Sequence, residues 1–93
     1  MDGTSGRLVG HKLKRTVQDI VLNGRVEYTK HLALRLVQRG ISVGDILNCL
    51  QRGAFAEDGI DKYIATYQAI CTVFALETDE DGKLIVVVTA YRS

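Results

Sequence analysis

The sequence predicts an α+β domain, with two to three N-terminal helices packed on a three- to four-stranded antiparallel β-meander. Two observations lead to this fold class. Apolar residues recur at helical spacing up to Gly53, and beyond it they alternate as in strands. The length of 93 residues suits one domain and is too short for two. We therefore expect a flexible tail at residues 1–9 and a single domain at residues 10–93.

The first helix is predicted from His11 to Asn23. Leu13, Val17, Ile20 and Val21 fall on one side of it and form a single apolar stripe. Such a stripe is typical of a helix that packs on a core through one face.

Two more helices are predicted from their start signals. Thr29 can cap a helix at residues 30 to 38 or 39. Ser42 and Asp45 form the S-x-x-D pattern of a capping box, which begins the third helix, and Gly53 ends it.

Strands account for the rest of the chain. The alternating residues 25–28 form either a short strand or an extended lead into the next helix. The expected later strands cover residues 54–57, 62–67, 70–78 and 83–91. Polar turns at 58–61 and 79–82 connect them in part. The run Leu84–Val88 is apolar on both faces, which predicts a central strand covered by helices on at least one side.

Charge is unevenly distributed, although the net charge is only +1. Residues 1–53 carry nine Lys and Arg against four Asp and Glu, whereas residues 54–93 carry three against seven. A basic half can attract phosphates, but an acidic half can equally be the polar side of a sheet. No apolar run is long enough to cross a membrane, and no signal peptide is seen, so we expect a cytoplasmic protein.

The second predicted helix carries the candidate chemistry. His31, Arg35 and Arg39 lie within an arc of about 80°, at 100° per residue. We expect the opposite side to face the core, with Leu32, Ala33, Leu36 and Val37. Guanidinium groups bind phosphate oxygens in a bidentate fork, and histidine exchanges protons near neutrality. The alternative is an ordinary solvated helix face.

The C-terminus offers a second set of candidates. On a strand, Thr89 and Tyr91 point to one face and Arg92 to the other. They could bring a hydroxyl, a phenol and a cation next to His31, Arg35 and Arg39. Alternatively, they simply pack against the sheet. No metal-ligand spacing and no glycine-rich phosphate loop occur, so we expect neither metal nor cofactor. Cys49 and Cys71 are interpreted as buried core residues rather than as a disulfide.

A family resemblance combines these pieces. The ordered segments Tyr28–His31, Arg35, Arg39–Ser42, Asp79–Lys83 and Val88–Arg92 follow the pattern H-x-x-x-R-x-x-x-R-G-I-S with a closing T-x-Y-R. Over about residues 25–92 the chain resembles a bacterial family of domains of unknown function, number 4258. In layout that family is similar to small toxin-like ribonucleases of the RelE and BrnT kind.

The resemblance implies metal-independent RNA cleavage. His31 would act as base or acid, Tyr91 would be its counterpart, and Arg35 and Arg39 would stabilise the charged phosphorus centre. Arg35, Arg39, Thr89 and Arg92 would also hold the RNA phosphates. The alternative is a non-catalytic module that binds nucleic acid or protein through the same basic face, so whether the chain is an enzyme is left open. RNA and an antitoxin-like protein are the expected partners, and the oligomeric state is not predicted.

Overall fold

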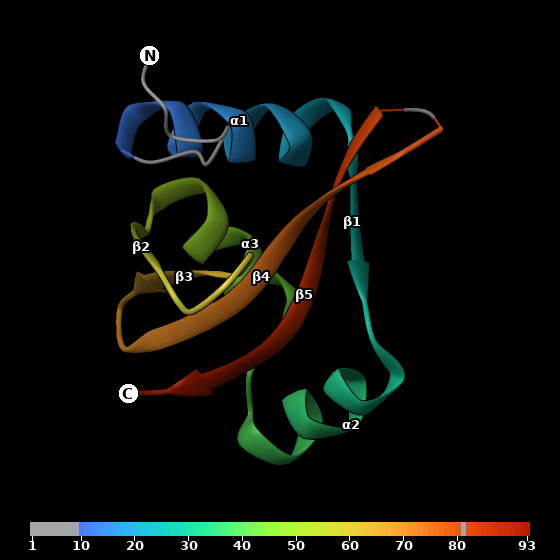
Figure 1. Cartoon of the computed structure of the whole chain (residues 1–93). Coiled ribbons are helices and arrows are strands. Elements are labelled where there is room, and N and C mark those ends of the chain that lie inside the picture. The colour runs from blue at the N-terminus through green and yellow to red at the C-terminus, as the bar shows by residue number, and fades with distance from the viewer. Residues whose placement is uncertain (1–9, 81) are drawn as a thin grey trace.

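A computed structural model describes residues 10–80 and 82–93 (Figure 1). The tail predicted at residues 1–9 lies outside these described ranges. Within them the chain forms three helices and one sheet. The elements are α1 (Gly10–Asn23), β1 (Arg25–Tyr28), α2 (Lys30–Arg39), α3 (Val43–Arg52), β2 (Ala54–Glu57), β3 (Tyr63–Tyr67), β4 (Ile70–Asp79) and β5 (Gly82–Arg92).

The sheet has five strands in the order β1-β5-β4-β3-β2. Strands β2 to β5 form the predicted antiparallel meander. Strand β1 pairs in parallel with β5, with Arg25 opposite Leu84 and Tyr28 opposite Val87. The α+β class is confirmed, and the sheet has one strand more than the predicted three to four. The short segment 25–28 is therefore a strand, and it makes β5 an interior strand.

Helices α1 and α3 pack against each other and against the sheet, and α2 packs mainly against β5 (Figure 1). One buried apolar cluster joins these layers. The largest fully buried side chains are those of Val17, Leu32, Ile46, Cys49, Leu50, Thr72, Phe74, Ile85 and Val87. Figure 1 places α1 and α2 at opposite ends of the molecule, on either side of the long strands.

The predicted caps of α2 and α3 are confirmed. The hydroxyl of Thr29 accepts a hydrogen bond from the backbone N–H of Leu32 at 3.2 Å. Gly40 ends α2 in the left-handed conformation with φ of 67°. Ser42 and Asp45 form both bonds of the capping box, at 2.9 and 3.0 Å. These local signals fix where α2 stops and α3 starts, and so position the basic side of α2.

The predicted core side of α2 is wrong in part. Leu32 and Leu36 are buried, but Ala33 is exposed and Val37 has 83% of its surface accessible. The reason is that α2 packs mainly against β5, through a narrow stripe, whereas the prediction assumed a broad buried face.

Two irregularities shape the C-terminal half. A β-bulge interrupts the pairing of β4 with β5, because Val73 pairs with Thr89 but Phe74 pairs with Val87. Val88 is the extra residue, and a bulge of this kind bends the strand and redirects its side chains. The two-residue turn between β3 and β4 holds Gln68 and Ala69 at φ of 48° and 67°, which is unusual for residues other than glycine.

Candidate functional site

Two arginines tie the end of α2 to the end of β5. Nη1 of Arg39 donates to the carbonyl oxygen of Ala90 at 2.7 Å and to the hydroxyl of Thr89 at 3.5 Å. In return, Nε and Nη2 of Arg92 donate to the carbonyl oxygens of Arg39 at 3.3 Å and of Gly40 at 2.8 Å. The structure thus brings Arg39, Thr89 and Arg92 together.

The contacts of Arg92 satisfy carbonyl groups at the end of α2. The last carbonyls of a helix have no partner within the helix and carry its partial negative charge, so a guanidinium is favoured there. Arg92 supplies that cation to α2. Arg39 uses only its Nη1 group for these contacts, and the Nη1 group of Arg92 has no partner among the described residues. Each guanidinium therefore keeps N–H donors for a further acceptor.

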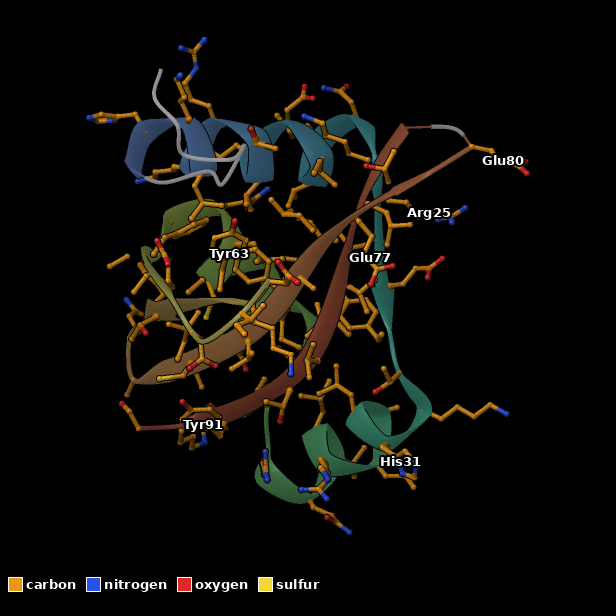
Figure 2. The ribbon with its side chains drawn as sticks, in the orientation of Figure 1. Arg25, His31, Tyr63, Glu77, Glu80 and Tyr91 are labelled. Carbon is orange, nitrogen blue, oxygen red and sulfur yellow. The ribbon has the colours of Figure 1, made fainter. Side chains whose placement is uncertain are left out.

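The other candidate residues of α2, Arg35 and His31, are exposed. At 1.5 Å per residue, Arg35 lies about 6 Å and His31 about 12 Å from Arg39 along the helix axis. Both side chains are solvent-exposed. Figure 2 shows His31 on α2 and Tyr91 on β5, apart from each other. The structure therefore groups two arginines with Thr89, and it does not bring His31 and Tyr91 together.

The cations of α2 lack acidic partners within the part of the chain that the structure describes. Helix α2 contains Lys30, Arg35 and Arg39 and no acidic residue. Among residues 10–80 and 82–93, no carboxylate forms an ion pair with these three side chains or with Arg92. We define Arg35, Arg39 and Arg92 together with His31 as the basic row. A carboxylate paired with these cations would lower the affinity of the basic row for anions. None of the described carboxylates forms such a pair.

A pocket of about 200 Å³ opens beside Arg92, between α3 and the turn that joins β3 to β4. Its lining residues are Asp45, Asn48, Tyr67, Gln68, Ile70 and Arg92. The lining is mostly polar. Sequence reasoning missed this pocket, because Asp45 was interpreted as a capping residue only and nothing in the sequence links α3 with the turn.

The two cysteines belong to the packing. Both thiols are free and buried, as predicted for core residues. Burial raises the pKa of the Cys49 thiol, which favours its neutral form over the nucleophilic thiolate. Within the described residues, no group of three or more His, Cys, Asp and Glu is placed to hold a metal ion. In the same ranges, no helix is both long and apolar enough to span a membrane.

The fold and the site define a small α+β domain with a basic helix that is bonded to the end of its last strand. Residues 28–92 match the family described as Domain of unknown function (DUF4258), and the chain belongs to that family. The match confirms the predicted family and runs from the end of β1 to Arg92, so it includes the whole basic row. A search of curated proteins found no match. The likeness to RelE- and BrnT-type toxins stays a prediction.

Proposed function

We propose that this domain binds single-stranded RNA through the basic row of α2 and the end of β5. The observation that carries the proposal is the grouping of Arg39 and Arg92, with spare N–H donors, one helical turn from the exposed Arg35. Guanidinium groups bind phosphate in a planar, bidentate manner and stay charged at any working pH. A row about 12 Å long suits consecutive phosphates of a flexible strand better than a single small anion.

RNA cleavage is the more specific form of this proposal. It would use His31 as base or acid and Tyr91 as its counterpart, and such groups act only within hydrogen-bond reach of the reacting atoms. Figure 2 shows His31 on α2 and Tyr91 on β5, apart from each other, and this arrangement favours binding without cleavage. An antitoxin-like protein is the alternative partner, and no contact of the described residues favours it over RNA.

The test compares charge-matched variants in fluorescence anisotropy with a labelled single-stranded RNA. Arg35→Gln removes a cation of the basic row, and Arg15→Gln removes one from α1, at the other end of the molecule (Figure 1). One phosphate contact contributes about −0.7 to the slope of log K against log salt concentration. This corresponds to an affinity about fivefold higher at 0.1 M salt than at 1 M salt. We expect Arg35→Gln to weaken binding by about that factor at 0.1 M salt and Arg15→Gln to leave it nearly unchanged.

The same samples separate binding from cleavage. Incubated RNA should remain intact on a denaturing gel, and His31→Ala should change neither this result nor the fold of the protein. Equal losses of affinity in the two arginine variants would refute the basic row as the binding surface. RNA fragments that appear with the wild-type protein and disappear with His31→Ala would show that the domain cleaves RNA and does not only bind it.

A further inference from the structure

The pocket beside Arg92 contains opposite charges that do not neutralise each other. Asp45 and Arg92 both line it, yet no ion pair within 4.0 Å joins their side chains. A carboxylate and a guanidinium that share a cavity of about 200 Å³ without contact leave room for a ligand between them. That ligand has to offer hydrogen-bond donors to one side and acceptors to the other.

The pocket residues keep hydrogen-bonding capacity for such a ligand. Asp45 uses Oδ2 to accept from the backbone N–H of Ser42 at 2.9 Å, whereas Oδ1 accepts no bond from a described residue. Arg92 uses Nε and Nη2 for backbone carbonyls, which leaves Nη1. Asn48 and Gln68 each add an amide that both donates and accepts. A bare phosphate matches this set poorly, since the carboxylate would repel it.

The turn at the pocket is held in an unfavourable conformation. Gln68 and Ala69 have positive φ angles, although two-residue turns of this kind normally use Asn or Gly. Left-handed residues other than glycine are strained and are found preferentially at functional sites. The strain alone does not define a site, but here it places Gln68 in the lining of the same pocket.

We propose that this pocket takes a guanine base of the bound RNA, with Asp45 and Arg92 reading opposite ends of its edge. Guanine presents two adjacent N–H donors, which suit an acceptor-only carboxylate, next to the O6 acceptor, which suits a guanidinium. Unstacked bases of single-stranded RNA are read on these edges. The inference rests on the proposed function, because Arg92 belongs to both the basic row and the pocket.

The experiment uses four labelled oligouridine RNAs of equal length that carry G, A, C or U at one central position. The full chain should bind the G-containing RNA at least fivefold more tightly than the other three, in line with the discrimination of a well-placed polar contact. Asp45→Asn should abolish the preference, because the amide keeps an oxygen for Ser42 but adds a donor. Asn48→Ala, outside the capping box, should reduce the preference. Asp58→Asn, an exposed carboxylate in the turn before β3, is the charge-matched control and should keep it.

The outcomes separate this inference from the function on which it rests. Equal wild-type affinity for all four RNAs, together with a loss in Arg35→Gln, overturns the base pocket and leaves RNA binding intact. A preference that persists in both Asp45→Asn and Asn48→Ala also overturns it. No RNA binding by the wild-type chain overturns both. Circular dichroism of each variant shows that any lost preference does not come from unfolding.

Discussion

Replacing Arg39 by Met should destabilise the domain, because Arg39 holds α2 to β5. Its Nη1 donates to the carbonyl oxygen of Ala90 at 2.7 Å, and Ala90 is fully buried. A hydrogen bond from a charged donor contributes about 1.5–3 kcal/mol, and its loss leaves a buried carbonyl without this partner. Methionine keeps most of the aliphatic stem, so we expect a loss of about 2 kcal/mol in the free energy of unfolding.

Urea denaturation followed by circular dichroism measures this loss. In a domain of this size 2 kcal/mol corresponds to a decrease in Tm of about 8–16 °C. Arg35→Met is the matched control, since Arg35 lies one turn earlier on α2, is exposed and has no partner among the described residues. We expect it to change stability by less than about 0.5 kcal/mol. Equal effects of the two substitutions would refute the structural role assigned to Arg39.

Three further predictions follow from the turn, the cap and the buried thiol. Ala69→Gly should stabilise the domain by about 0.5–1 kcal/mol in urea titrations, because it relieves a left-handed residue at a smaller entropic cost; a loss of stability would contradict the turn conformation. Ser42→Ala should cost about 1 kcal/mol in the same assay, and no loss would mean that the capping box does not hold α3. Since burial raises the pKa of Cys49 above its ordinary 9.0, the unfolded state loses this proton first. Stability should therefore be intact below about pH 9 and fall above it, and a wild-type fall no steeper than that of Cys49→Ala would contradict this cause.

Local signals account for how well the fold could be predicted. The bounds of α2 and α3 follow from Thr29, Gly40 and the Ser42–Asp45 capping box, each of which acts within a few residues of the chain. The parallel pairing of β1 with β5 joins segments nearly 60 positions apart, and four alternating residues do not specify a partner. The bulge at Val88 was likewise missed, because it depends on the register between two strands.

The candidate site was predictable only where one helix determines it. Helical periodicity placed Arg35 and Arg39 on one side of α2, and this needs no tertiary information. The contact of Arg39 with β5 and the pocket beside Arg92 require the packing of several elements. Helical periodicity also made a wrong prediction at Val37. This apolar residue was expected in the core, but it is exposed because α2 packs mainly against one strand, β5.

The salt dependence of RNA binding reveals whether the basic row binds phosphates. If Arg35, Arg39 and Arg92 each neutralise one phosphate, log K should fall with log salt with a slope of about −2, at about −0.7 per contact. Arg35→Gln should reduce the magnitude of that slope by about 0.7, and Arg15→Gln on α1 should leave it unchanged. A slope near zero, or the same slope in all three proteins, would contradict phosphate binding by the basic row.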